Sequence, residues 1–426
     1  MNYKEALEYI HTTYRFGRKL GLENISKLLE LLGKPQEKLN IIHVAGTNGK
    51  GSTCSFISRI LQEGGYKVGL YTSPFLETFN ERIRINGEDI KDDDLGRVTA
   101  IVKEKADEMV ASGYNHPTEF EIVTAIAFYY YYEQAVDYLV LEVGMGGRFD
   151  ATNVIRPLLS VITSISLDHI DYLGDTLGKI AYEKAGIIKE NIPLVLYPQE
   201  KEAESVIEEV AASKNAPIYK VNSDQIKIKE TSLEGQTFEI PEFGELKTSL
   251  IGEHQVKNAF TAFTAISLLR KNGVKLEDEA IRRGIENTRW AGRLELMKKK
   301  PTIIIDGAHN EEGAQALGKA IDDYMSDKNI KLVLGMLSDK DVDKVTSILV
   351  PRVKSVIATV PDSDRALSAD ELKAKILKFE KEVISIPNIS DAVDYSIKES
   401  NKDDVIIFAG SLYMIGEVRS ILKKLI

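Results

Sequence analysis

The chain has a single cysteine, Cys54, among its 426 residues, so no disulfide can form within it. It has no uninterrupted apolar run near the roughly 20 residues that a membrane-spanning helix needs. It also lacks an excess of basic residues, since 65 acidic side chains outnumber 55 basic ones and the formal charge is −10. These absences argue against a disulfide scaffold, a membrane protein and a general nucleic-acid binder. Together with the polar start MNYKEALEY, they predict a cytoplasmic protein.

What is present is typical of a globular protein, with 43% hydrophobic and 28% charged residues. The length exceeds that of one ordinary core, so two domains are expected. We expect an N-terminal domain over residues 1–290, a hinge linker over 291–300 and a C-terminal domain over 301–426. We place the domain boundary in the segment TRWAGRLELMKKK, because it is charged and joins two series of strands and helices.

The first series alternates buried-type strands with helices, which predicts a parallel sheet covered on both faces. A small added β element with hairpin strands is expected over residues 225–252, followed by helices over 254–271 and 277–287. A second βα series begins at PTIIIDGAHN and predicts a Rossmann-like, doubly wound domain. The expected strands of the first series are 39–46, 67–73, 137–144, 158–166 and 193–198, and its expected helices are 51–63, 121–135 and 177–189.

The stretch IIHVAGTNGKGST, Ile41–Thr53, is close to a Walker A phosphate-binding loop and departs from it twice. Val44 stands where the first glycine of that motif belongs. Gly51 separates Lys50 from the hydroxyl of Ser52. The spelling therefore indicates phosphate chemistry of a less common kind.

The physical requirements of phosphate binding are nevertheless met. Gly46 and Gly49 allow the backbone to fold around an anion, and the helix that follows points its amides back at it. Lys50 can reach a β- or γ-phosphate, and Ser52 or Thr53 can offer a hydroxyl to Mg²⁺. A glycine-rich turn without a ligand is the alternative, and the strand before and helix after favour a nucleotide. The predicted contacts of the loop are Gly46, Thr47, Asn48, Gly49, Lys50, Gly51 and Ser52.

Polar residues follow three further predicted strands. Glu142 ends one strand, Asp168 and His169 follow another, and Ser73 follows a third. Ligands of parallel sheets bind at this edge, and oxygen donors with one imidazole suit Mg²⁺. Taken alone, His169 is better explained as an ordinary loop residue.

These motifs give the chain a family resemblance. GTNGKGS resembles the phosphate loop of the Mur ligase superfamily, in particular of its folylpolyglutamate synthase and dihydrofolate synthase branch. The resemblance extends over nearly the whole chain, because further blocks follow in the order of that family. They are GLENISKLLELLGKP, YTSPFLETFNERIRING, LEVGMGGRFDATN, SLDHIDYLGDTLGKIAYEKAGIIK, GEHQVKNAFTA, RWAGRLE, DGAHN and FAGSLYMIGEV.

The resemblance implies a magnesium site, because Ser73, Glu142 and His169 match the magnesium positions of the family. Two Mg²⁺ are expected per active site. It further implies that Lys184 is carbamylated, which turns a cation into an anionic oxygen ligand. Without the family, Lys184 would be a solvated lysine on a helix.

The resemblance also assigns contacts outside the loop. Asn258, Arg293 and Asp306 match ATP contacts, although Arg293 alone could be a linker charge. His309 and Ser411 are our candidates for binding the incoming glutamate, and His309 joins Lys50 and Lys184 as a candidate catalytic residue. The residues that match the pteridine pocket are Phe120, Phe149, Asp150 and Ala151. Helical spacing allows Phe120 equally to be a core residue.

Two positions depart from the family pattern. Phe75 replaces a histidine that members often carry, and Asp364, Arg365 and Ala366 stand where many have Pro-Arg-Ala. These departures concern the preferred folate or amine, since neither touches the phosphate or magnesium positions.

The expected activity is ATP-dependent addition of L-glutamate to a reduced folate, to dihydropteroate or to both, through an acyl phosphate. The expected enzyme is a monomer that binds neither nucleic acid nor membrane. One alternative is a Mur-type ligase acting on a cell-wall precursor, which is disfavoured because only 40 residues precede Ile41. Another is a nucleotide-gated module without enzymatic activity, which leaves the motifs of the second domain unexplained.

Overall fold

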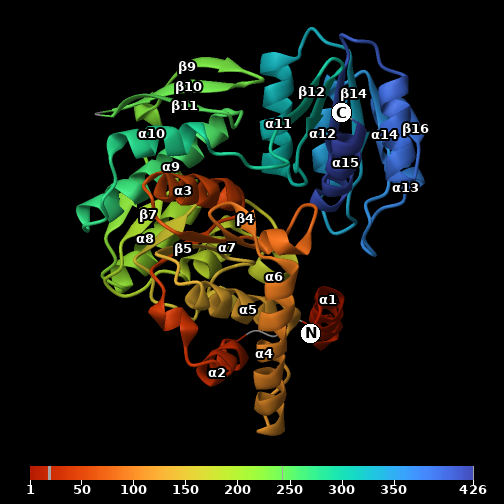
Figure 1. Cartoon of the computed structure of the whole chain (residues 1–426). Helices are drawn as coiled ribbons and strands as arrows, with labels where there is room; N and C mark the ends of the chain where they lie inside the picture. Colours follow the sequence, from red (N-terminus) through yellow and green to blue (C-terminus); the bar gives the residue numbers. More distant parts are fainter. Residues whose placement is uncertain (18–20, 242, 426) are drawn as a thin grey trace. The chain divides into compact units, whose positions relative to one another are not determined.

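The computed structural model describes residues 1–17, 21–241 and 243–425. It divides the chain into two compact units (Figure 1). The first unit comprises 1–226, 240–242 and 257–288, and the second comprises 227–239, 243–256 and 289–426. The second unit thus includes most of the hairpin segment that the sequence predicts, and residue 242 of that segment lies outside the described residues.

The first unit is built on a sheet of order β4-β3-β2-β5-β1-β6-β7-β8 in the described part of the chain. From β2 to β8 neighbouring strands are parallel, whereas β3 and β4 are antiparallel additions at one edge. The strands are β1 Ile41–Ala45, β2 Val68–Tyr71, β3 Ile83–Ile85, β4 Glu88–Asp89, β5 Tyr138–Glu142, β6 Leu159–Ile162, β7 Leu194–Leu196 and β8 Ile218–Lys220.

Helices cover both faces of this sheet because the strands are apolar on both sides. One core joins the sheet to α1, α2, α4 and α5, with Tyr71 and Phe128 fully buried in it. A second core joins β6 and β7 to α7 and α8 through Ile180 and Ile207. The helices are α1 Tyr3–Thr12, α2 Glu23–Leu31, α3 Lys50–Glu63, α4 Asp92–Ala111, α5 Glu119–Glu133, α6 Ile170–Leu173, α7 Leu177–Ala185, α8 Lys201–Ser213, α9 Glu253–Lys271 and α10 Asp278–Glu286.

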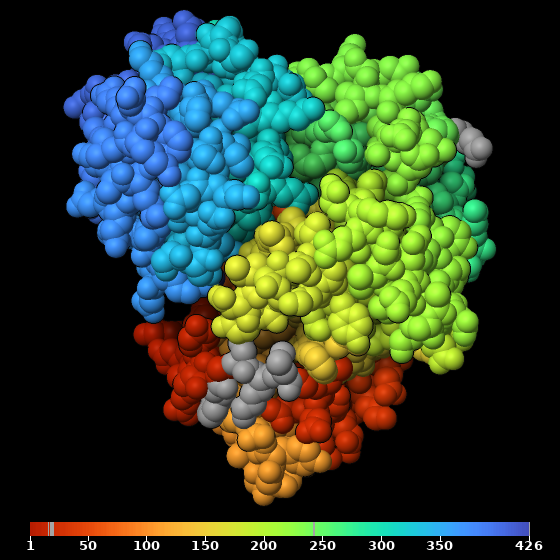
Figure 2. Space-filling view, turned by 180° about the vertical axis from the view of Figure 1, so that it is seen from behind, coloured from red at the N-terminus to blue at the C-terminus, as the bar shows by residue number. Residues whose placement is uncertain are grey.

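Helix α4 projects from the described part of the first unit. Helix α4 extends beyond its neighbours α1 and α2 in Figure 1, and its end forms the orange tip of this unit in Figure 2. No helix among the described residues is long and apolar enough to cross a membrane.

The second unit contains a six-stranded sheet of order β12-β13-β17-β14-β15-β16 in its described residues. Five strands are parallel, which confirms the predicted doubly wound domain, and β12 runs antiparallel to β13. A separate sheet of order β11-β10-β9, in which β10 runs antiparallel to β9, confirms the predicted hairpin element. The strands are β9 Lys227–Ser232, β10 Gly235–Ile240, β11 Gly244–Thr248, β12 Glu295–Lys299, β13 Thr302–Ile305, β14 Ile330–Leu334, β15 Ser355–Ala358, β16 Glu382–Ser385 and β17 Val405–Ala409.

The second unit has five α-helices in its described residues, and the first three pack on the six-stranded sheet around one apolar core. The five helices are α11 Glu311–Tyr324, α12 Val342–Leu349, α13 Ala369–Ile376, α14 Ile389–Lys398 and α15 Leu412–Leu425. Strand β12 lies within residues 291–300, the segment expected to be a linker. Its charges suit a sheet edge, and Glu295 pairs with Arg419 of α15 at 2.8 Å. The domain limits given from the sequence stay a prediction.

Helices α3 and α10 approach each other closely at a glycine. An ideal Cβ placed on Gly284 would lie 2.5 Å from Cα of Ile60, which is backbone and cannot swing aside. We expect Gly284→Ala to lower the free energy of unfolding by about 1–3 kcal/mol, because α10 must move away from α3. The measurement is the midpoint of urea-induced unfolding.

Gly178→Ala is the matched control, since its Cβ would meet the flexible side chain of Glu202 at 3.0 Å and the side chain of Val206 at an ordinary contact distance of 3.6 Å. This control should keep or raise stability, because alanine favours a helix. Equal effects of the two substitutions would contradict the close packing at Gly284.

Candidate active site

The segment between β1 and α3 adopts a conformation that requires its glycines. Gly46 has φ +151°, and a Cβ there would lie 1.8 Å from Oγ1 of Thr163. Gly49, which caps α3, has φ +82°, and its Cβ would lie 2.5 Å from Oδ1 of Asn258. The loop is therefore packed against side chains on both sides, and Asn258 of α9, whose role as an ATP contact stays a prediction, lies beside it.

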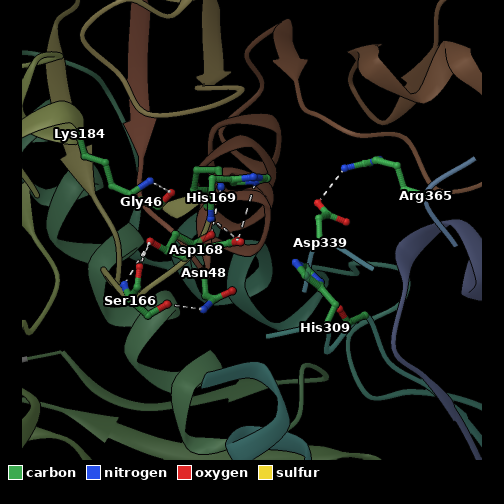
Figure 3. Close-up of polar contacts among 12 residues, drawn as sticks. Gly46, Asn48, Ser166, Asp168, His169, Lys184, His309, Asp339 and Arg365 are labelled. Carbon is green, nitrogen blue, oxygen red and sulfur yellow. Dashed lines mark hydrogen bonds and ion pairs between the residues drawn. The ribbon is translucent and has the colours of Figure 1, made fainter. Parts of the chain in front are cut away.

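The loop is held by the residues that follow β6. Thr47 donates its backbone N–H to the carbonyl of Ser164 at 2.7 Å, and Thr163 donates its hydroxyl to the carbonyl of Asn48 at 2.8 Å. The side-chain amide of Asn48 donates to Oγ of Ser166 at 3.2 Å (Figure 3). These bonds fix the backbone of the loop before any ligand arrives, so its amides are preorganised for an anion.

Lys50, Glu142 and Ser73 come together at the ends of β1, β5 and β2. Nζ of Lys50 lies 3.1 Å from the carbonyl oxygen of Thr47 and 4.0 Å from Oε1 of Glu142. Glu142 is 4% exposed, and its Oε2 accepts the backbone N–H of Ser73 at 3.0 Å. The three residues meet because β5 lies between β1 and β2 in the parallel sheet.

Lys184 is buried, unlike the solvated lysine that its helix alone suggests. Its Nζ donates to the carbonyl of Gly46 at 2.9 Å, and Figure 3 shows the side chain of α7 reaching toward the loop. Burial, aided by the positive charge of Lys50, lowers the pKa of Lys184 from 10.5 to about 7. The carboxylates of Asp168 and Asp150 oppose this shift. The amine is therefore partly neutral near neutral pH.

A pocket of about 310 Å³, part of it open to solvent, lies over these groups. His169 contributes to its wall with φ +50°, and its Nε2 lies 3.9 Å from Oδ2 of Asp168. The pocket thus brings together the phosphate loop, the catalytic candidate Lys184 and the metal candidate His169. Its lining consists of Gly46, Thr47, Lys50, Val143, Gly144, Met145, Gly146, Asp168, His169, Leu173 and Lys184.

A divalent cation would fit this site only with help from a phosphate. No group of three or more His, Cys, Asp or Glu side chains in the described residues could hold a metal by itself. The site does offer the buried carboxylate of Glu142, and the buried hydroxyl of Thr53 has no hydrogen-bond partner among the described residues. Mg²⁺ suits such a site, because it commonly takes one or two carboxylates and completes its shell with phosphate and water.

The candidate folate residues differ in exposure. Phe149 is 46% exposed, whereas Asp150 and Ala151 are buried. The ring of Phe120 is partly buried, with its centroid 6.3 Å from that of Tyr71. Phe120 thus packs against the core as its helical spacing allows, and Phe149 is the aromatic side chain of the set that is open to solvent.

Asp150 is held by a buried hydrogen-bond network that was not predicted from the sequence. Oδ2 of Asp150 accepts the backbone N–H of Met145 at 2.9 Å, and Oδ1 accepts the hydroxyl of Thr152 at 2.5 Å. The only proton of that hydroxyl is then used, so Nε2 of His43, at 2.9 Å, must donate to it. Burial, with a smaller contribution from Lys189, lowers the pKa of His43 to about 3, which keeps it neutral. In the sequence, only the position of Thr152 within the FDATN block could have indicated these buried hydrogen bonds.

In the second unit, Asp306 and Arg293 lie near the end of β13. Both oxygens of Asp306 accept backbone N–H groups, from Leu294 and from Ala308, each at 2.8 Å. Burial raises the pKa of Asp306, and the charge of Arg293 opposes this. Nη1 of Arg293 donates to the carbonyl of Gly292 at 3.0 Å. The two expected ATP contacts of this unit are thus electrostatic neighbours.

His309 and Ser411 follow β13 and β17, which are adjacent parallel strands. Nδ1 of His309 lies 2.7 Å from the carbonyl oxygen of Gly307. Ser411 is buried, and its hydroxyl has no hydrogen-bond partner among the described residues.

The segment where the family often has Pro-Arg-Ala is held by an ion pair. Figure 3 shows this pair, between Arg365 and Asp339, with a distance of 2.8 Å.

Comparison with known proteins adds the decisive observation. The Mur ligase middle domain matches residues 44–266, and the Mur ligase glutamate ligase domain matches 292–412. The dihydrofolate synthase/folylpolyglutamate synthase of Bacillus subtilis is 40% identical over 432 aligned positions, which cover 99% of each chain. This chain belongs to the folylpolyglutamate and dihydrofolate synthase branch of the Mur ligases.

Solved structures of the same Mur ligase branch agree over the full length. Mycobacterium tuberculosis folylpolyglutamate synthase, complexed with ADP and AMPPCP, matches with a TM-score of 0.90 and 31% identity over 99% of each chain. Escherichia coli FolC, in complex with DHPP and ADP, matches with a TM-score of 0.88 and 29% identity, covering 100% of this chain and 98% of that one. The two-domain α/β fold expected from the sequence is confirmed, and the roles of single residues stay predictions.

The low pKa of Lys184 has a consequence for stability. The unfolded chain binds the proton more readily between pH 7 and 10.5, so the cost of burying Lys184 is fully present below pH 7 and is relieved as the pH rises. Relative to the natural chain, Lys184→Met should therefore be most stable below pH 7 and lose that advantage above it. Urea midpoints measured from pH 6 to pH 10 in carbonate-free buffer test this.

Lys179→Met serves as the control, because Lys179 is an exposed lysine on the same helix and pairs with Asp175. A stability difference for Lys184→Met that is constant across the pH range would contradict a depressed pKa.

Proposed function

We propose that this ligase uses ATP to join L-glutamate to a folate acceptor, either a reduced folate or dihydropteroate, through an acyl phosphate. The observation that carries the proposal is the cluster of Lys50, Glu142 and Ser73 beside a preorganised phosphate loop. Its support is membership in a branch whose named relatives are dihydrofolate and folylpolyglutamate synthases, together with the structures of two of them bound to ADP.

The chemistry needs an activated carboxylate because a carboxylate is a poor electrophile. A carboxylate oxygen of the acceptor attacks the γ-phosphorus of ATP, the bond to the bridging oxygen breaks, and ADP leaves. The amine of glutamate then attacks the acyl carbon, phosphate leaves, and a proton is lost from nitrogen to give the amide. Lys50 and the loop amides stabilise the negative charge of the transferring phosphoryl group.

Ser73, Glu142 and His169 would hold Mg²⁺ at this site, where the cation supplies charge compensation for the phosphates. The contribution of the chain is a fixed, buried carboxylate in Glu142, held by the backbone N–H of Ser73 at 3.0 Å. We propose two such ions per active site, as the family resemblance implies.

Lys184 is proposed to carry a carbamate. With a pKa of about 7, much of its amine is neutral at neutral pH and can attack CO₂, forming an N–C bond and releasing one proton. The carbamate removes the buried positive charge and adds oxygen atoms next to Lys50. This gives the buried lysine a function that an ammonium group lacks.

The remaining substrate contacts follow the family positions. Asn258, Arg293 and Asp306 are proposed to bind ATP, and His309 with Ser411 the incoming glutamate. The buried, partnerless hydroxyl of Ser411 supports a ligand there. Phe120, Phe149, Asp150 and Ala151 are proposed to line the pteridine pocket. We propose a cytoplasmic monomer, in keeping with the single cysteine.

The three-substrate requirement tests the function directly. Purified protein should release phosphate only when ATP, a pteroyl acceptor and glutamate are all present, and labelled glutamate should enter the folate. Lys50→Met should lower kcat by roughly 10²–10³, because one donor to the transferring phosphoryl group is lost. Assays with tetrahydrofolate and with dihydropteroate, each offered separately, show whether the enzyme has one or both of the two synthase activities.

Phosphate release that is indifferent to glutamate would speak for a nucleotide-gated module. Release with a cell-wall precursor but with neither pteroyl compound would favour the other Mur ligase activity.

Carbamylation of Lys184 is measured by ¹³C NMR of protein equilibrated with ¹³C-bicarbonate. We expect a carbamate resonance that is lost in Lys184→Met and retained in Lys179→Met, and whose intensity falls below pH 7 as the amine becomes protonated. Identical spectra for the natural chain and Lys184→Met would refute the modification.

A further inference from the structure

The loop between β2 and β3 is built around one carboxylate. Oε2 of Glu81 accepts the backbone N–H of Leu76 at 2.8 Å, and Oε1 accepts those of Glu77 and Thr78 at 2.9 and 3.0 Å. Three amide bonds to one side chain fix the course of residues 76–78. Phe75 and Arg82, on either side of this turn, are therefore held in place.

Arg82 is a partly buried cation inside this loop. Its guanidinium carbon lies 5.2 Å from the ring centroid of Phe75 and 5.5 Å from that of Phe79. Its Nε is buried without a hydrogen-bond partner, and its guanidinium forms no ion pair with the described residues. The two ring centroids are 6.0 Å apart, so the guanidinium lies beside both rings. Buried charges are normally paired, so an arginine whose donors are unused beside two aromatic rings suggests an anionic ligand.

The neighbouring carboxylates of Glu81 and Asp89 already have other partners. Glu81 accepts the three amides and also lies 3.4 Å from Arg84, and Asp89 pairs with Arg84 at 2.9 Å. Tyr71 faces the same region, since the charge of Arg82 opposes the rise in the pKa of Tyr71 that burial causes. The cation thus has no counter-ion of its own within this loop.

The position of Arg82 links it to the phosphate site. Its backbone carbonyl accepts the N–H of Thr72 at 3.1 Å, and the next residue, Ser73, donates to Glu142. A substrate whose reacting carboxylate lies at Glu142 and Lys50 would therefore have its neighbouring groups close to this loop.

We propose that Arg82 binds the α-carboxylate of the glutamate residue that a folate acceptor already carries, while the γ-carboxylate is phosphorylated. This rests on the proposed function. The planar guanidinium can take a carboxylate with two parallel hydrogen bonds. The rings of Phe75 and Phe79, whose centroids lie 5.2 and 5.5 Å from its carbon, limit the space on one side of it. Dihydropteroate has only the reacting carboxylate, so Arg82 separates the two classes of acceptor.

The non-reacting carboxylate is the better partner for a physical reason. A guanidinium bound to the attacking carboxylate would withdraw electron density from the oxygen that must attack phosphorus. In the proposed reaction, moreover, Lys50 already stabilises the phosphoryl group that the reacting carboxylate attacks. A cation that binds the other carboxylate orients the substrate without weakening its nucleophile.

The experiment compares two acceptors on Arg82→Met, which keeps an unbranched side chain beside the rings of Phe75 and Phe79 and removes the charge. We expect the KM for tetrahydrofolate to rise roughly 10- to 100-fold with little change in kcat, since a hydrogen-bonded charge pair is lost. The KM for dihydropteroate, or its inhibition constant if it is not turned over, should stay unchanged. Arg82→Lys should recover part of the loss, and Arg97→Met, which removes an ion-paired arginine of α4, should have no effect.

A second measurement uses the natural chain with a tetrahydrofolate analogue whose α-carboxylate is an amide. The analogue should bind weakly to the natural chain and equally weakly to Arg82→Met. Undiminished binding to the natural chain overturns the proposal even if the variant fails to fold. An equal rise in KM for both acceptors would assign Arg82 to the reacting carboxylate and would also overturn the proposal. A natural chain that ligates neither acceptor would overturn the proposed function itself.

Discussion

The hydrogen bonds between the end of β6 and the phosphate loop are the constraint on which the rest of the site depends. Thr163 and Ser164 hold the peptide groups of Asn48 and Thr47, and the amine of Lys184 holds that of Gly46 from α7. The loop is thus fixed by two different elements of the same unit. Its amides keep their direction without a ligand, so binding an anion costs little conformational entropy.

The charges around this loop explain how an acidic protein can bind a polyanion. The chain carries a net charge of −10, yet Lys50 and the peptide groups of the phosphate loop lie at the same pocket. Oε1 of the buried Glu142 lies 4.0 Å from Nζ of Lys50, and its Oε2 accepts the backbone N–H of Ser73. Triphosphate and divalent cation together would balance this arrangement better than either alone, which agrees with a reaction that transfers a phosphoryl group.

The sequence predicted the framework because periodicity and loop chemistry are local. It placed α3 within one residue and found β1, β5 and β6 as buried runs. It missed β3 and β4, although Asn86 and Gly87, with φ of 52° and 85°, form the kind of turn that marks a hairpin. It also treated the charged residues of β12 as a linker, because an edge strand that faces solvent resembles a loop in composition.

Burial and pairing could not be predicted in the same way. Nothing in the spacing of EKAGIIK distinguishes a solvated lysine from Lys184, whose surroundings come from β1 and from residues far away in sequence. His43 lies in an apolar strand and finds Thr152 only through the fold. The free guanidinium of Arg82 became visible only when the partners of Glu81 were known.

The amide of Asn258 lies in the space next to Gly49, more than two hundred residues after the loop that it completes. Synthesis on the ribosome proceeds from the N-terminus, so the strand and the glycines emerge long before α9 does. A nascent chain that stops short of α9 has the whole phosphate loop in its sequence but not the side chain that packs against it. The nucleotide site of this protein is therefore finished late in translation, although its signature lies among the first sixty residues.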